Sequence, residues 1–192
     1  MAEEIGISPT PLREAYRQLA SEGIVTHVPN AGIFIRELDK NEIAELYGLR
    51  EALETFAVRK AAQRMDLLQI DELKECCDIQ KRLSKKLFNS EADQLSSNEQ
   101  IEYMQVDATF HLNIINATEN NVIIKTLKEC HIMSHLLSSN SHKHNLTQVK
   151  TTINHHLEIL KYIEAHDPEN GEKWMRRHIQ FSAKTALKNQ QK

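Results

Sequence analysis

One segment, Ser8 to Ile35, constrains the fold of this chain more than any other. Thr10-Pro11 predicts a helix start, because a hydroxyl can cap the first turn and proline is tolerated at its first position. Gly23 predicts the end of that helix. Two short β-like runs follow on either side of a turn, Ile24–Val28 and Ile33–Ile35. A helix followed by a tight hairpin is typical of the recognition helix and wing of a winged helix-turn-helix.

Two arginines of this segment are candidates for DNA contact. Arg13 and Arg17 lie one helical turn apart, on a different face from the apolar residues Leu12, Tyr16 and Leu19. A basic helix face beside a hairpin suits a major groove flanked by phosphates. Residues 1–36 nevertheless carry three arginines against four glutamates. We therefore expect weak non-specific DNA affinity.

The same segment resembles the DNA-binding end of GntR-family bacterial transcription regulators. The family pattern is a small residue with Thr-Pro-hydrophobic-Arg-Glu-Ala, then Arg-x-Leu, Glu-Gly-hydrophobic-Val and a glycine-containing wing. The matching residues are Thr10, Pro11, Arg13, Glu14, Ala15, Arg17, Leu19, Glu22, Gly23 and Gly32. The resemblance implies DNA contacts from Thr10, Arg13, Arg17 and Gly32. The family usually has arginine where this chain has Pro9, and about thirty further residues with the first helix of the motif. The chain thus looks truncated at its amino end, and we expect this form to bind operator DNA weakly.

The rest of the chain reads as helical. It has 192 residues, with five glycines and four prolines, of which three lie before residue 30. Capping signals and apolar periodicity predict helices over about residues 39–65, 68–88, 99–117, 120–138, 146–165 and 168–188, with a loop at 138–145. Short connections favour antiparallel neighbours. We expect a mostly α fold: a partial winged helix-turn-helix (1–36) followed by an all-α antiparallel helical bundle (37–192).

Charge and hydropathy place the chain in a broad class. The net charge is −3, no run of eighteen apolar residues exists, and the start lacks a basic-then-apolar signal segment. We expect a soluble cytoplasmic protein with no membrane partner.

Four polar residues fall on the apolar stripes of three predicted helices. Asp107 and His111 lie one turn apart on the third helix, His156 lies on the fifth and His178 on the sixth. Burying one carboxylate and three imidazoles costs free energy unless something joins them, and a divalent metal ion would do so. The alternative is a set of hydrogen-bonded core histidines. The pair His131 and His135 is a rival metal site. His155 is a rival to His156 but falls on the more polar side of its helix.

The helical part resembles the FCD ligand-binding domain of the FadR branch of the same family. That domain carries Asp-x-x-x-His, then a histidine followed by Ile-Leu, then a last histidine twenty-two residues on. The matching residues are Asp107, His111, His156 with Ile159-Leu160, and His178, and Asn120 or Asn121 matches an asparagine after the first metal helix. The family often has an acidic residue where this chain has His155. The resemblance implies a divalent metal ion, with zinc first and nickel or manganese as alternatives, that holds a small carboxylate effector. It also implies a homodimer.

Arg50 lies on the inner stripe of the first bundle helix, with Glu54 one turn later. A buried arginine requires an anion. Either Arg50 pairs with Glu54, or it reaches the rim of the bundle, or it binds the carboxylate of an effector.

These features together predict a DNA-binding transcription regulator controlled by a small carboxylate through a metal-containing helical domain. We expect no catalytic residues and no enzyme activity. A metal-dependent hydrolase is one alternative. Against it, no glutamate lies one turn from the candidate ligands on the same helix face, where it could act as a general base. Glu158 lies two residues from His156, on a different side of the helix. The other alternative is a truncated sensor that has lost DNA binding and acts only by dimerising.

Overall fold

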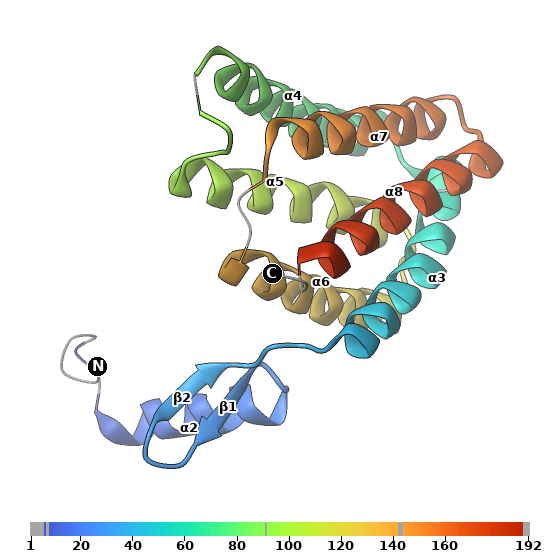
Figure 1. The fold of residues 1–192 in the computed structure, drawn as a ribbon. Helices are drawn as coiled ribbons and strands as arrows, with labels where there is room; N and C mark the ends of the chain where they lie inside the picture. The colour runs from blue at the N-terminus through green and yellow to red at the C-terminus, as the bar shows by residue number, and fades with distance from the viewer. Residues whose placement is uncertain (1–5, 7, 91, 142–143, 190–192) are drawn as a thin grey trace. The chain divides into compact units, whose positions relative to one another are not determined.

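The computed structural model describes residues 6, 8–90, 92–141 and 144–189; within these ranges the side chains of residues 9, 135–141 and 189 are not described. Contacts divide the chain into two compact units, Met1–Leu38 and Asp39–Lys192 (Figure 1). We call them the amino-terminal unit and the helical unit. The sequence had suggested a boundary between residues 36 and 37, two residues earlier.

The amino-terminal unit contains α2 (Pro9–Ser21), β1 (Val25–Val28) and β2 (Gly32–Ile35). The two strands form an antiparallel hairpin in which Val28 pairs with Gly32. Gly23 ends the helix with a φ of 71°, a left-handed conformation that glycine adopts without steric cost. The chain then turns directly into the hairpin. The predicted helix and wing are therefore present.

The predicted start of α2 is wrong. Thr10 is not the N-cap and Pro11 is not the first helical residue, because α2 begins at Pro9, after an extended Ser8 that makes no side-chain capping bond. Proline fits the first turn because N–H groups there have no intrahelical acceptor. The sequence Pro-Thr-Pro therefore lets the helix start two residues earlier.

The helical unit consists of α3 to α8 over the described residues. Their bounds are α3 (Lys40–Arg64), α4 (Leu67–Asn89), α5 (Ser97–Asn116), α6 (Asn121–Ser141), α7 (Leu146–Glu164) and α8 (Pro168–Asn189). Capping boxes at Asp39, Asp66, Ser96 and Asn145 fix four of the helix starts. Asn120 accepts hydrogen bonds from two N–H groups at the start of α6, and Asp167 accepts one at the start of α8. The mostly helical fold class is confirmed.

Two details differ from the sequence-based prediction. α6 continues to Ser141, so residues 138–141 are helical and not part of a loop. Serine and asparagine lower helix propensity only moderately, and no glycine or proline interrupts the run.

The packing partners of the helices also differ from the expectation. α3 packs on α8, α5, α6 and α7, while α4 packs on α5 and α7 (Figure 1). The short connection from α3 to α4 therefore does not make these two helices packing partners.

The core of the helical unit lies where α5, α7 and α8 meet α3. Phe110, Ile114, Ile159, Ile163 and Met175 are fully buried there. Within the described residues, no helix combines the length and the apolar character that a membrane crossing requires.

Leu73 and Leu68 on α4 offer a matched test of this packing. Leu73 is 0% exposed and Leu68 is 77% exposed. We expect Leu73→Ala to lower the free energy of unfolding by about 2–5 kcal/mol, because it leaves a cavity. Leu68→Ala should change it by only about 0.5 kcal/mol. Urea denaturation of both variants measures the difference, and equal losses would contradict the observed orientation of α4.

Candidate metal centre and adjoining cavity

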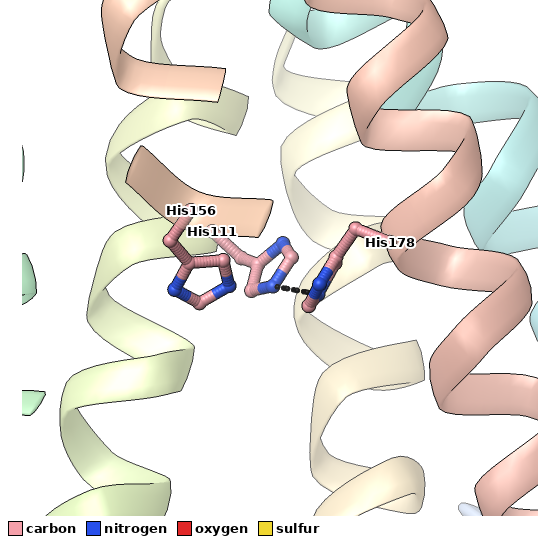
Figure 2. A group of neighbouring side chains, drawn as sticks. All are labelled: His111, His156 and His178. Atoms are coloured by element: carbon pink, nitrogen blue, oxygen red, sulfur yellow. Dashed lines mark hydrogen bonds between the residues drawn. The ribbon is translucent and has the colours of Figure 1, made fainter. Parts of the chain in front are cut away.

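Three histidines meet inside the helical unit. His111 comes from α5, His156 from α7 and His178 from α8, and their rings are turned toward one another (Figure 2). One ligand atom from each lies within 4.8 Å of the other two, and Nε2 of His111 is 3.1 Å from Nε2 of His178. We call this group the imidazole trio. Helical periodicity had placed each member on a buried stripe, and tertiary packing brings the three stripes together.

Packing and hydrogen bonds hold two rings of the trio. The ring of His156 stacks on Phe110, with centroids 4.1 Å apart and an interplanar angle of 10°. Nδ1 of His156 donates to Oε1 of Gln80 at 2.9 Å, and Nδ1 of His111 donates to Oε2 of Glu54 at 2.5 Å. Nδ1 of His156 therefore carries a proton, and in the neutral ring this leaves the lone pair on Nε2. Nε2 of His156 is thus presented as an acceptor or ligand.

The charge state of two rings of the trio, His156 and His178, follows from their burial. Burial lowers the pKa of His156 to about 3, despite the nearby carboxylate of Asp107. Burial also lowers the pKa of His178 well below its usual value, and His156 and His111 add to the effect. At neutral pH both rings are therefore uncharged, the form in which imidazole binds a metal ion.

Asp107 lies beside the trio without joining it. Its Oδ1 is 3.7 Å from Nε2 of His156, which is beyond hydrogen-bonding distance. Nε2 of His156 is fully buried and meets no hydrogen-bond partner among the described residues. The carboxylate of Asp107 is 23% exposed and faces the adjoining cavity. Three of the four predicted metal ligands therefore converge, with the fourth at their edge.

Arg50 is buried, as expected, and it does pair with Glu54. Nε of Arg50 donates to Oε1 of Glu54 at 2.7 Å, and Nη1 donates to Oγ of Ser134 at 3.2 Å. Burial raises the pKa of a carboxyl group, but Arg50, followed by His111 and His131, outweighs burial and holds the pKa of Glu54 well below its usual value. Glu54 is therefore an anion shared by the guanidinium of Arg50 and the ring of His111.

A second group could also offer ligands to a metal ion. Glu54, His111 and His131 have ligand atoms within 4.8 Å of one another, and Nε2 of His131 is 3.2 Å from Oε1 of Glu54. This group lies on the Nδ1 side of His111, opposite the trio. The side chain of His135, the predicted rival partner of His131, lies outside the described part of the chain.

His155 was expected on the more polar side of its helix, and this is wrong. It is 4% exposed, and its ring packs edge-on against Phe181 and beside Trp174. The reason is that α8 covers this side of α7, which the sequence of α7 alone does not indicate.

A cavity of about 80 Å³ adjoins the trio. One part of its wall carries His178, Asp107, Arg50, Ser134 and Tyr47. The rest is formed by Tyr103, Met104, His144, Gln148, Thr152, Phe181, Ser182, Thr185 and Ala186. The cavity thus joins two charged groups, one member of the trio and a wall of mixed polar and apolar side chains.

Sequence reasoning missed two residues of this region. Gln80 and Ser134 were not singled out, although each is a buried polar residue that hydrogen-bonds a predicted site residue. Gln80 follows Leu73 and Cys76 on the buried stripe of α4, so a polar residue on an apolar stripe was the available signal. No comparable signal marks Ser134.

The candidate DNA-contacting residues lie in the amino-terminal unit. Thr10, Arg13 and Arg17 are exposed on α2, and Gly32 is exposed at the start of β2. Leu12 and Tyr16, on another face of α2, are partly buried. The two arginines are one turn apart and accessible to a ligand.

Comparisons with known proteins agree with this architecture. Residues 45–181 match the FCD domain, and residues 1–35 match the bacterial regulatory proteins of the gntR family. The Nta operon transcriptional regulator of Aminobacter aminovorans is 33% identical over 128 residues, which cover 67% of this chain and 55% of that protein. The gluconate operon transcriptional repressor of Bacillus subtilis is 31% identical over 124 residues, which cover 64% of this chain and 46% of that protein. The chain thus spans about half the length of these relatives.

Solved structures share the fold. E. coli McbR/YncC superposes with a TM-score of 0.79 at 22% identity, over 100% of this chain and 85% of that chain. A metal-free FCD domain superposes with a TM-score of 0.61 at 18% identity, over 81% of this chain and 99% of that chain. Both curated relatives are named as transcriptional regulators. With its helical unit matched over residues 45–181, the chain belongs to the GntR family of bacterial regulatory proteins, in the branch that carries an FCD domain.

Proposed function

We propose that this chain is a DNA-binding transcription regulator whose helical unit holds a divalent metal ion and, beside it, a small carboxylate effector. The observation that carries the proposal is the convergence of His111, His156 and His178 next to a cavity that also exposes Arg50. The name of the Nta operon regulator and the family match support the regulatory role. As expected for such a regulator, we place the protein in the cytoplasm as a homodimer.

The trio fits a metal ion in spacing and in chemistry. Two nitrogens bound to one ion at about 2.1 Å lie roughly 3 Å apart when their directions are at right angles. The 3.1 Å between the Nε2 atoms of His111 and His178 has this size. Nε2 of His156 is buried without a hydrogen-bond partner among the described residues, which costs free energy that a metal ion would offset. Asp107 would supply an oxygen ligand from the cavity side.

Glu54 and Gln80 fit the role of outer partners of such a site. Metal-bound histidines commonly pass their other ring N–H to a carboxylate or a carbonyl, which fixes the ring and raises its basicity. His111 and His156 do so here. A mixed nitrogen and oxygen set suits zinc first, with nickel or manganese as alternatives.

The group formed by Glu54, His111 and His131 is the weaker metal candidate. Glu54 is already compensated by Arg50 at 2.7 Å. A divalent cation there would lie close to the guanidinium, and the two positive charges would repel in a poorly hydrated interior. Asp107, by contrast, adds a negative charge beside the trio.

The effector would lie in the cavity between the trio and Arg50. Three histidines and Asp107 leave open positions on an ion that accepts five or six donors, and a carboxylate oxygen is a natural occupant. The guanidinium of Arg50 would bind a second oxygen of the same molecule. The ion and a fixed guanidinium together select an acid by the distance between its anionic groups. Binding at this cavity would alter the packing of α3 and α8, and so the spacing of two recognition helices in a dimer.

We predict one divalent ion per chain, held by the trio and Asp107. His178→Ala should remove it, because it deletes a ligand of the trio but of no other group. His131→Ala should retain it. Elemental analysis after dialysis, with zinc, nickel and manganese added in turn, measures the content. The reverse result, loss with His131→Ala and retention with His178→Ala, would move the site to the second group.

We predict that a small carboxylic acid raises the thermal unfolding temperature of the metal-loaded protein. A panel of hydroxy, keto, dicarboxylic and sugar acids should contain at least one stabiliser. Its effect should disappear with EDTA and shrink in Arg50→Lys, which keeps the charge beside Glu54 but loses the planar fork of donors. Arg59→Lys is the control, because Arg59 lies on the same helix and forms surface pairs with Glu169 and Glu172. A neutral ligand that stabilises regardless of EDTA and Arg50 would refute the effector proposal.

We predict that Arg13 and Arg17 carry the DNA contacts. A duplex selected from a random pool by the protein should bind the Arg13→Ala variant about tenfold or more weakly, as expected for loss of a base or phosphate contact worth about 1–3 kcal/mol. Arg82→Ala removes the same charge from an exposed site on α4 and should leave affinity unchanged. Fluorescence anisotropy gives the dissociation constants. Metal and acid binding without any duplex binding would instead support a sensor that has lost DNA binding.

A further inference from the structure

The outer face of α4 and α7 carries a groove of about 320 Å³. The two helices lie side by side (Figure 1). Two contacts show that they are antiparallel. Nζ of Lys74 on α4 lies 3.0 Å from Oε1 of Glu164, near the end of α7. The ring of Phe88, near the end of α4, has its centroid 4.6 Å from Nζ of Lys150, near the start of α7.

The residues that line the groove recur at helical spacing. They are Lys81, Ser84 and Lys85 of α4 and Lys150, Ile153, Asn154 and Leu157 of α7. Residues three, four and seven positions apart share one face of a helix, so the groove follows α7 for about two turns, or roughly 10 Å. It shares no lining residue with the cavity beside the trio.

The floor of the groove is apolar. Ile153 is 7% exposed and belongs to a hydrophobic core cluster, against which the partly buried Leu157 packs. Ser84 lines the groove from α4 with a small side chain that leaves the depression open. Phe88, one turn further along α4, is 65% exposed and continues the apolar surface. Burial of this surface under a partner would be favourable.

The rims of the groove are positively charged. Lys81 and Lys85 line it from α4 and Lys150 from α7, and no acidic residue is among its described lining. Lys81 pairs with Asp78 at 2.9 Å. Lys85 and Lys150 form no ion pair within the described part of the chain. Two uncompensated ammonium groups on opposite rims favour an occupant with negative charges along both of its edges.

From this combination we infer that the groove binds an amphipathic helix of a partner protein, with an apolar stripe flanked by aspartates or glutamates. A helix laid across two antiparallel helices packs its side chains into the groove between them. Two turns of groove accommodate apolar anchors at positions i, i+3 or i+4, and i+7. The flanking carboxylates then lie beside Lys85 on one rim and Lys150 on the other.

The floor argues against two other occupants. A nucleic acid presents phosphates and sugars, so it would leave Ile153 and Leu157 without an apolar partner. A small amphiphilic anion is normally enclosed over most of its surface, whereas this groove is open along its length.

The test is a selection of displayed helical peptides on the full chain. The peptides are about 18 residues long, because shorter isolated helices are marginal. Their stripe positions vary among leucine, isoleucine, phenylalanine and alanine, and their flanks among glutamate, glutamine and lysine. Counter-selection uses Lys85→Glu/Lys150→Glu, which reverses the charge on both rims. We expect to recover peptides with an apolar stripe and glutamate flanks. By fluorescence anisotropy, they should bind the counter-selection variant about tenfold or more weakly.

Two further variants assign the binding to the groove. Lys125→Glu/Lys128→Glu is the matched control, because it reverses two exposed lysines on α6, outside the groove, and should keep the affinity. Leu157→Asn makes the floor more polar without changing the charge and should weaken binding. Since Lys85 and Lys150 are also exposed, their substitution should leave the thermal unfolding temperature nearly unchanged.

Several outcomes would overturn the inference. One is that no recovered peptide distinguishes the chain from the counter-selection variant, and another is that the recovered flanks are neutral or basic. An equal loss of affinity in the α6 control would show a general charge effect, and unchanged affinity in Leu157→Asn would remove the apolar stripe from the floor. If no peptide binds, but a duplex of random sequence loses affinity in Lys85→Glu/Lys150→Glu, the groove is a nucleic-acid site instead.

Discussion

The helical unit depends on one buried carboxylate. Glu54 is 0% exposed, and its two oxygens contact Arg50 on its own helix and His111 across the core. A guanidinium and a carboxylate can be buried only when each meets an opposite charge or hydrogen-bond partners, because the cost of removing an isolated charge from water is otherwise not offset. Removing either partner would therefore leave an uncompensated charge in the interior. The contact also fixes the proton of His111 on Nδ1, so the same interaction that neutralises Arg50 prepares the trio on the other side of the ring.

This arrangement divides the interior into two regions of different chemistry. On the Glu54 side, Arg50 and His131 both contact the carboxylate, and Arg50 also donates a hydrogen bond to Ser134. On the opposite side, three imidazoles face one another and a cavity whose wall carries Asp107, with two ring nitrogens still unpartnered among the described residues. Arg50 belongs to both regions, since it pairs with Glu54 and lines the cavity. An anion that binds in the cavity would compete with Glu54 for the guanidinium, and this provides a physical link between ligand binding and the packing of α3.

Much of the site was predictable because helical periodicity is local. Asp107 and His111, one turn apart, and the apolar neighbours of His156 and His178 were enough to place these side chains on buried faces. The partners that orient them were not predictable in the same way. Glu54 lies 57 residues from His111, and Gln80 lies 76 residues from His156. No spacing rule connects such pairs, because their contact depends on the packing of separate helices. The burial of His155 under α8 escaped prediction for the same reason.

The sequence by itself determined the secondary structure and the two-part organisation of the chain. Capping residues such as Asp39 and Asp66, the Gly23 turn and the wing hairpin act within a few residues, so they can be read directly, with an error at Pro9 where either of two prolines could open the helix. Only the tertiary structure decided which polar groups meet. It made Glu54 the common partner of Arg50 and His111, and it set Asp107 at the edge of the trio. The physical reason is that the energy of a buried polar group depends on atoms contributed by distant helices, and those contacts exist only once the helices have packed.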